Sequence, residues 1–374
     1  MLQKTQAMES LPMENGIAII GRIPPPYGGV SVHIYRLLER LKAEKLPHTF
    51  YQLDSNTAND LPIIIHVLRG VKLFCQLAVS NHSLYHLHMS NPMGVILGGG
   101  LTKVCKKDVC FSLHGEGILN DIQNKNILLS YALKLSIRSA DHIFAINPDA
   151  PNKLQKLGVF EDRITLMPAY IPPYPDEINY PVPKELKDFI KRHSPILASQ
   201  GSFGSFICKN KEQKDIYRFD LLVQLLVSLK QEYPDVGLCT MISKNFDSEH
   251  RKFIYDLINK FDLHNSWYIY EGTPMPAINV YKQCDVFIRP TETDGDSVSV
   301  RECLDLEIPC IASDAVPRPE GCVLFTAGNA QECYNRVMSV LANPETYRLK
   351  LRKKQPTDHL VGLIKYYRAR ISHE

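Results

Sequence analysis

The chain has 374 residues, which is enough for about two domains at roughly 150 residues each. Charged residues make up 22% and hydrophobic residues 44%, close to the averages of soluble globular proteins, so wholesale disorder, collagen and coiled coil are excluded. Lysine and arginine number 43 against 40 aspartates and glutamates, and this net charge of +3 is too small for a nucleic-acid coat. We therefore expect no nucleic-acid partner.

The ten cysteines are scattered, without a CxxC pair and without the clustered His/Cys spacing of a zinc site. This usage is typical of reduced thiols and predicts a cytoplasmic protein with no metal centre. The N-terminus lacks the apolar core of a signal peptide, and no stretch reaches the ~18 uncharged apolar residues of a membrane span. The sequence thus predicts a protein that is neither secreted nor membrane-spanning.

In chain order, apolar β-branched runs alternate with helical patterns, of which the first starts near Val30 and the second covers 62–80. The strands expected in this first half are GIAII (17–21), HTFYQL (48–53), SLYHLH (83–88), CFSLH (110–114), HIFAI (142–146) and RITLM (163–167). Repeated βα alternation predicts a parallel, doubly wound sheet.

A proline-rich stretch with little helical period follows, and we place an interdomain linker over 171–190. The elements expected after it are strands PILAS (195–199), GLCTMI (237–242), SWYIY (266–270), DVFIR (285–289) and IPCIA (308–312), and helices 219–232 and 298–306. The pattern predicts an α/β protein with two Rossmann-like domains, 1–170 and 191–355, that face a cleft. We expect the C-terminal segment, 356–374, to form a helix that crosses back to the first domain.

Gly28 and Gly29 follow the first expected strand and open a helix. Glycines there let a ligand approach the backbone, and the free amides with the helix dipole form an anion site. An ordinary tight turn explains the pair equally well. The pair is not GxGxxG, and no GxxxxGK[ST] occurs, which weakens an interpretation as an NAD or P-loop site.

His114 directly follows another expected strand, at the carboxyl end where open α/β sheets bind ligands. Its imidazole can donate to a sugar oxygen or to developing charge, although a lone histidine at a strand end is more often structural. His86 and His88 have the same structural interpretation, and we assign them no role.

The segment DVFIRPTETDGDSVSVRECLDLEIPCIASD (285–314) is the most informative. A strand ends at Arg289, an acidic loop follows, and Ser297 can cap the next helix, whose first amides would face an anion. Asp294 in the loop and Glu302 in the helix lie eight residues apart. Carboxylates there can accept hydrogen bonds from the vicinal hydroxyls of a sugar or ribose. The alternative is an acidic loop followed by a solvated helix glutamate.

In its context this segment resembles the signature of retaining glycosyltransferases of the GT-B "family 4" group, whose E-x7-E motif is matched by Asp294 and Glu302 with Asp in the first position. The resemblance covers nearly the whole chain, and the other stretches that carry it are IPPPYGGVSVH, SLHGEG, ADHIFAINPDAPNKLQKLGV, RITLMPAYIPP and IPCIASDAVPRPEG. It is closest to the enzymes of bacterial capsule, exopolysaccharide and O-antigen assembly.

The resemblance implies that Glu302 holds the donor ribose, that Asp294 contacts the transferred sugar and that His114 faces it. Gly28 and Gly29 would lie against the diphosphate. The sugar hydroxyls and diphosphate would be held around Gly295, Asp296, Ser297, Val298 and Ser299. The resemblance also implies a donor bound mainly to the second domain, an acceptor bound mainly to the first, no separate base, and no cofactor beyond the nucleotide-sugar itself.

The family also supplies an arginine and a lysine after the first strand of the second domain, and these neutralise the leaving diphosphate. This chain departs from that pattern, because Gly201-Ser202 and Tyr217-Arg218 stand at those positions. The candidates for a substitute cation are Arg218, Lys209, Lys211 and Lys214. The DGD tripeptide at 294–296 imitates a metal motif, but it lies where the family binds sugar, so we expect no metal there.

The expected helix over 62–80 carries a polar, basic stripe at steps of three and four, which includes Arg69 and Lys72. Lys134 and Arg138 form a smaller basic pair further along the chain. Membrane-surface helices have such stripes, and so does a core helix with a solvated face. The first interpretation predicts a peripheral protein at the inner membrane face.

We therefore expect a retaining, metal-independent hexosyltransferase that moves a sugar from a nucleotide-diphosphate sugar to a glycan or lipid-linked acceptor in surface polysaccharide biosynthesis. Two alternatives stay open. One is a sugar-nucleotide epimerase of the same architecture, which interconverts donors without an acceptor. The other is a non-catalytic subunit that binds nucleotide-sugar without turnover, which the missing Arg/Lys pair suggests.

Overall fold

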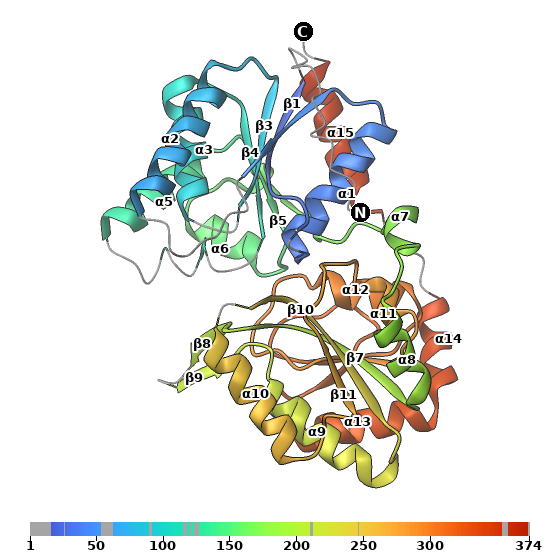
Figure 1. Ribbon diagram of the computed structural model, residues 1–374. Helices are drawn as coiled ribbons and strands as arrows, with labels where there is room; N and C mark the ends of the chain where they lie inside the picture. Colours follow the sequence, from blue (N-terminus) through green and yellow to red (C-terminus); the bar gives the residue numbers. More distant parts are fainter. Residues whose placement is uncertain are drawn as a thin grey trace. The chain divides into compact units, whose positions relative to one another are not determined.

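The computed structural model describes residues 16–25, 27–53, 63–89, 92–114, 118–119, 122, 127–209, 212–245, 247–353 and 358–372. These residues form two compact units (Figure 1). The first unit comprises the described residues of Met1–Ile23, Val30–Ile171 and Asp358–Glu374. The second comprises those of Pro24–Gly29 and Pro172–Thr357.

The first unit is built on a six-stranded parallel sheet with the strand order β2-β1-β3-β4-β5-β6. Its strands are β1 (Ile17–Gly21), β2 (His48–Gln52), β3 (Leu84–Met89), β4 (Val109–Leu113), β5 (His142–Ala145) and β6 (Ile164–Leu166). All five residues of β1 and of β4 are buried. Such continuous burial is typical of parallel strands covered by helices on both faces. The chain order changes direction between β1 and β3, which makes this the switch point of the sheet.

Helices cover both faces of this sheet. They are α1 (Gly29–Ala43), α2 (Ile63–Val79), α3 (Pro92–Cys105), α5 (Ile127–Ser139), α6 (Ala150–Lys156), the short 3-10 helix η1 (Glu161–Arg163) and α15 (Leu360–Ile371). Figure 1 shows α1 and α15 on one face of the sheet and α2, α3 and α5 on the other. The C-terminal helix α15 belongs to this unit because Leu360, Leu363, Ile364 and Tyr367, at helical spacing, enter the same core as the apolar stripe of α1.

The second unit repeats the design with a six-stranded parallel sheet in the order β11-β10-β7-β12-β13-β14. Its strands are β7 (Ile196–Phe203), β10 (Gly237–Asn245), β11 (Trp267–Tyr270), β12 (Val286–Arg289), β13 (Cys310–Ser313) and β14 (Val323–Phe325). An antiparallel hairpin, β8 (Phe206–Lys209) and β9 (Glu212–Asp215), follows β7. The switch point lies between β7 and β12.

The helices of the second unit are α7 (Pro175–Ile178), α8 (Lys184–Arg192), α9 (Phe219–Glu232), α10 (Ser248–Lys260), α11 (Ile278–Tyr281), α12 (Val298–Asp305), α13 (Ala330–Ala342) and α14 (Pro344–Arg352). One core joins the sheet to α9, α10 and α13, and another joins it to α8, α11 and α12. The interval 171–190, expected to be a linker, contains α7 and most of α8. Leu186, Phe189 and Ile190 of α8 are buried in the second of these cores.

Among the residues that the structure describes, no helix is both long enough and apolar enough to span a membrane.

Candidate functional site

The carboxyl ends of β7 and β12 meet at the switch point of the second sheet, where open α/β sheets bind ligands. β12 ends at Arg289, and an acidic loop leads from it to Ser297, the residue before α12. The residues that sequence analysis singled out in 294–302 therefore lie on one loop and one helix at this edge.

Three charged side chains form a buried cluster there. Arg289 donates to both carboxylate oxygens of Asp294, at 2.8 Å from Nε to Oδ2 and 2.9 Å from Nη2 to Oδ1. Arg318 donates to Oδ2 of the same carboxylate at 2.8 Å. The side chains of Arg289, Asp294 and Arg318 are only 7%, 11% and 2% exposed. Burial alone would raise the pKa of Asp294, but the two guanidinium groups hold that pKa below its usual value. With two cations for one anion, this arginine–aspartate cluster has one surplus positive charge.

Arg218, the first candidate for the missing cation, lies directly before α9 with a left-handed backbone (φ 51°). It donates to Asp220 through Nε at 2.8 Å and Nη2 at 2.9 Å, and to Glu292 of the acidic loop through Nη1. The hydrogen bonds that Arg218 donates to Asp220 are the main reason that the pKa of Arg218 is raised. Two carboxylates therefore offset its single charge. The side chains of Lys209 and Lys211 are not among those that the structure describes.

The start of α12 is arranged differently from the expected cap. Ser297 is the N-cap residue, but its side chain makes no capping hydrogen bond, so the expectation of a serine cap is wrong. Its hydroxyl instead pairs with that of Ser299 at 3.1 Å. Asp296 accepts from Arg301 Nε at 2.6 Å. Because the first amides of a helix have no partner within the helix, this end of α12 suits an anion.

Glu302 lies on the inward face of α12 and is 6% exposed. Its charge contributes, after burial, to raising the pKa of Tyr281, whose hydroxyl has no hydrogen-bond partner within the described part of the chain. The alternative of a solvated helix glutamate is therefore wrong for Glu302. The side chain of Asp294 is only 11% exposed, so it is not part of a solvated loop.

Gly28 and Gly29 belong to a short segment, Pro24–Gly29, that groups with the second unit. A Cβ added at Gly28 would meet nothing within 4 Å, and one at Gly29 would lie 3.8 Å from Val298 Cγ2. Neither glycine has a positive φ, so the backbone conformation does not require glycine at these positions. The pair leaves open space beside the first residue of α12.

A pocket of about 240 Å³ opens beyond the ends of β10 and β11 in the second unit. Its lining includes Tyr27, Gln200, Ser243, Tyr270 and Glu271. The carbonyl of Gln200 accepts from Arg289 Nη1 at 3.3 Å, which connects the pocket to the arginine–aspartate cluster. Burial raises the pKa of Tyr27 to about 12.

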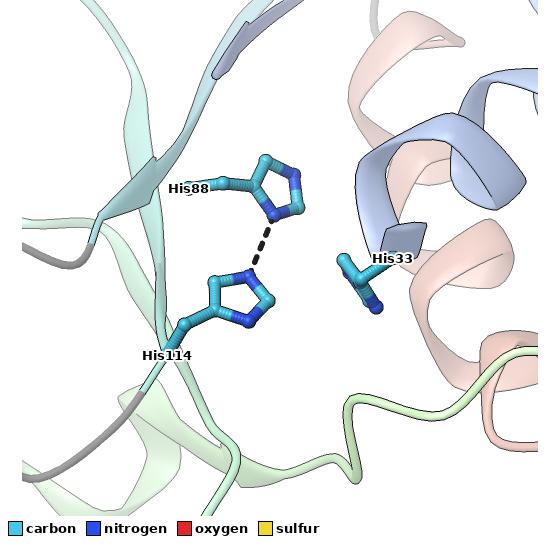
Figure 2. A group of neighbouring side chains, drawn as sticks. All are labelled: His33, His88 and His114. Carbon is cyan, nitrogen blue, oxygen red and sulfur yellow. Dashed lines mark hydrogen bonds between the residues drawn. The ribbon is translucent and has the colours of Figure 1, made fainter. Parts of the chain in front are cut away.

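The first unit contains a cluster of three histidines (Figure 2). His33 of α1, His88 of β3 and His114 after β4 each offer a nitrogen, and these three atoms lie within 4.8 Å of one another. His88 Nδ1 and His114 Nε2 are 3.1 Å apart. Burial lowers the pKa of His33 to about 4 and those of His88 and His114 well below the usual value. All three imidazoles are therefore neutral at physiological pH.

His86 is a satisfied core histidine, because its Nδ1 pairs with the Tyr367 hydroxyl of α15 and its Nε2 lies 2.9 Å from Ser112 Oγ. His88, which received no role from the sequence, instead lies beside His114. No role for His33 or Arg318 was predicted from the sequence. One signal was available: His88 and His114 end expected neighbouring strands, so their approach follows from the topology.

Comparison with known proteins shows which solved structures have a similar fold. No protein-family model and no curated protein matches the chain. Sucrose-phosphate synthase from Thermosynechococcus elongatus has a similar structure, with 15% identity, a TM-score of 0.69, and coverage of 96% of this chain and 100% of that one. Anabaena HepE, solved in complex with UDP-glucose, has 12% identity and a TM-score of 0.64, with coverage of 89% and 92%. The lipopolysaccharide outer core galactosyltransferase WaaB has 13% identity and a TM-score of 0.58, with coverage of 95% and 98%.

At these identities the similarity establishes the fold. The expected α/β architecture with two Rossmann-like parallel sheets is confirmed, and it is the GT-B fold of these neighbours.

Proposed function

We propose that this protein is a retaining glycosyltransferase that moves a sugar from a nucleoside-diphosphate sugar to a glycan or lipid-linked acceptor in surface polysaccharide assembly. The observation that carries the proposal is the set of groups at the carboxyl end of β12: the start of α12, a surplus guanidinium charge and the buried Glu302. Their combination suits a ligand with a diphosphate and hydroxyl groups. The neighbours of known activity or ligand, including HepE with UDP-glucose and the galactosyltransferase WaaB, support the same ligand class.

The diphosphate is assigned to the start of α12. Its counter-charge comes from helix amides and from the arginine–aspartate cluster, since Arg218 is already offset by Asp220 and Glu292. Fixed dipoles and charges that are aimed at developing charge supply much of the rate enhancement in many enzymes. Gly28 and Gly29 leave the space beside Val298 that a diphosphate would fill.

The sugar and nucleoside are assigned to the groups on either side. Glu302 accepts from the ribose hydroxyls, and the pocket near Gln200 takes the base. Asp294 accepts from the transferred sugar through Oδ1, which has one protein donor among the described residues and two lone pairs. His114, in the first unit, is assigned a hydrogen bond from its imidazole to a sugar oxygen.

The reaction needs no divalent cation at the diphosphate in this proposal. Asp294 and Asp296, the two carboxylates of the DGD tripeptide, are both held by arginines at 2.6–2.8 Å. These guanidinium groups compete with a metal ion for the carboxylate oxygens. The leaving diphosphate itself accepts the acceptor's proton.

We assign two roles to the first unit, which are binding of the acceptor and contact with an anionic membrane surface. Helix α5 exposes large apolar side chains, with Ile127 85%, Tyr131 68% and Leu135 47% exposed at steps of four. Arg138 on α5 and Lys72 on α2 are exposed cations, whereas the side chain of Arg69 lies outside the described residues. An apolar face with basic neighbours is typical of helices that lie on a membrane.

A transfer reaction tests the proposal. Purified protein is incubated with UDP-, GDP-, CDP- and ADP-glucose and with lipid-linked or oligosaccharide acceptors, and release of nucleoside diphosphate and the product anomer are followed by proton NMR. The proposal predicts acceptor-dependent release with retention. An inverted product contradicts the retaining mechanism, donor interconversion without acceptor identifies an epimerase, and nucleotide binding without any release identifies a non-catalytic subunit.

A further inference from the structure

We infer that His33, His88 and His114 form a mononuclear binding site for a divalent transition metal, with Zn²⁺ as the reference ion. The site lies within the first unit, where α1 packs beside the carboxyl ends of β3 and β4. It is separate from the groups proposed to hold the donor diphosphate, and nothing in its test depends on transferase activity.

The three imidazoles come from three different elements and face a common space (Figure 2). In a tetrahedral site with Zn–N bonds of about 2.0–2.1 Å, ligand nitrogens are about 3.3 Å apart. His88 Nδ1 and His114 Nε2 are 3.1 Å apart, and all three ligand atoms lie within 4.8 Å of one another. Small side-chain rotations therefore bring the nitrogens to metal-binding separation.

The hydrogen bond of His33 shows which of its two ring nitrogens carries the lone pair. His33 Nδ1 lies 2.6 Å from the carbonyl oxygen of Ala169 and must donate to it, so the neutral ring has its lone pair on Nε2. That Nε2 is buried and has no hydrogen-bond partner among the described residues. Buried polar atoms are rarely left without a partner. A metal ion satisfies the lone pair of His33.

The groups that hold these histidines are of the kind usually found around metal-binding histidines. A metal-binding histidine usually donates its other N–H to a carbonyl or carboxylate, as His33 does to Ala169. The ring of His88 packs against that of His86, with the centroids 4.2 Å apart. His86 is in turn held by Tyr367 and Ser112, so two of the three ligands have fixed neighbours.

The chemistry of the three ligands determines which class of metal ion the site would bind. Three neutral imidazoles without a carboxylate suit Zn²⁺, Co²⁺, Ni²⁺ or Cu²⁺ and not Mg²⁺ or Ca²⁺, which prefer oxygen ligands. Three histidines leave a fourth position for water or substrate. With Nε2 of His114 on the metal, its Nδ1 carries the proton and is the nitrogen left to donate.

The experiment uses the full-length chain after metal removal. Co²⁺ is titrated while the visible absorption bands of tetrahedral cobalt are recorded, Zn²⁺ is then added as a competitor, and melting temperatures are measured with Zn²⁺ and with Mg²⁺. We expect one equivalent of Co²⁺ to bind per chain and to be displaced by Zn²⁺. We also expect Zn²⁺ to raise the melting temperature and Mg²⁺ to leave it unchanged.

His114→Gln, at the half-buried edge of the cluster, is expected to weaken metal binding by at least about 10- to 100-fold. His264→Gln, at a 57% exposed histidine of the second unit, is the matched control and is expected to bind like the wild type.

Two outcomes overturn the inference. One is the absence of cobalt bands and of any zinc-induced stabilisation. The other is equal weakening, or equal binding, in the His114 and His264 variants, which means that only adventitious surface binding occurs. If His114→Gln does not fold, zinc X-ray absorption on the wild-type protein decides: three imidazole ligands support the site, and fewer imidazoles or any sulfur ligand contradict it.

Discussion

Replacing Asp294 with asparagine removes the carboxylate that pairs with two buried arginines. Both partners are nearly inaccessible, at 7% exposure for Arg289 and 2% for Arg318, so water cannot replace the lost charge. Breaking a buried ion pair by removing one partner typically costs about 3–5 kcal/mol, because the other charge stays buried without compensation. For a unit of roughly 150–250 residues this corresponds to a melting temperature lower by about 6–20 °C.

The chain offers its own probe for this measurement. Its single tryptophan, Trp267, lies in β11 of the second unit and is 4% exposed, so its fluorescence reports the unfolding of the unit that contains Asp294. Urea unfolding is followed at pH 7 for the wild type, Asp294→Asn and Asp220→Asn. The control residue Asp220 also pairs with an arginine but is 45% exposed, so its loss is expected to cost no more than about 1 kcal/mol.

The pH dependence has a definite sign. The folded pKa of Asp294 lies below its unfolded value of about 3.9, so the pairing stabilises the fold fully above that value and is lost as pH falls through the folded pKa. The stability gap between wild type and Asp294→Asn is therefore constant at neutral pH and narrows below about pH 4. Equal losses in the Asp294 and Asp220 variants, or a gap that does not narrow in acid, would refute the reasoning.

Three further predictions concern the proposed function. Glu302→Gln should weaken nucleoside-diphosphate binding by about 10- to 150-fold, since hydrogen bonds to a charged group contribute about 1.5–3 kcal/mol. The control is Glu307→Gln, at a glutamate whose side chain is 40% exposed, and calorimetry that finds the same loss of affinity in both variants would contradict the ribose assignment. EDTA should leave nucleotide affinity unchanged, and strict dependence of binding on Mg²⁺ or Mn²⁺ would give the DGD loop a metal role. The double variant Ile127→Ser, Tyr131→Ser should lose most of its co-sedimentation with anionic vesicles at low salt. The control Phe253→Ser, at an exposed apolar residue of the second unit, should sediment like the wild type. A double variant that still sediments with the vesicles contradicts the proposal that the first unit binds a membrane surface.

The alternation of apolar strands with helical patterns in the sequence was enough to predict two parallel α/β sheets. Buried β-branched runs mark covered parallel strands, and the helix expected over 219–232 has the same bounds as α9. Helix α3 was not expected, because Gly98, Gly99 and Gly100 disfavour a helix in isolation. A Cβ at Gly98 would lie 2.5 Å from the Phe111 ring, and one at Gly99 2.3 Å from Ser136 Oγ. Close packing therefore requires glycine there and overrides local propensity.

Only part of the candidate site could be predicted from the sequence. The loop and helix of 294–302 follow from chain order, since they come directly after a strand at the carboxyl edge. The ion pair between Asp294 and Arg318 joins residues 24 positions apart through the sheet, and no local pattern indicates it. The same is true of His33, which meets His88 and His114 only because α1 packs beside the switch point of the first sheet.

The most direct test of the central claim is isothermal titration calorimetry of the wild-type chain with UDP, GDP, CDP and ADP in the presence of EDTA. We expect one of these nucleoside diphosphates to bind with one-to-one stoichiometry and to raise the unfolding midpoint reported by Trp267. If none of the four binds, the carboxyl edge of the second sheet is not a nucleotide-sugar site, and the proposed transferase is contradicted.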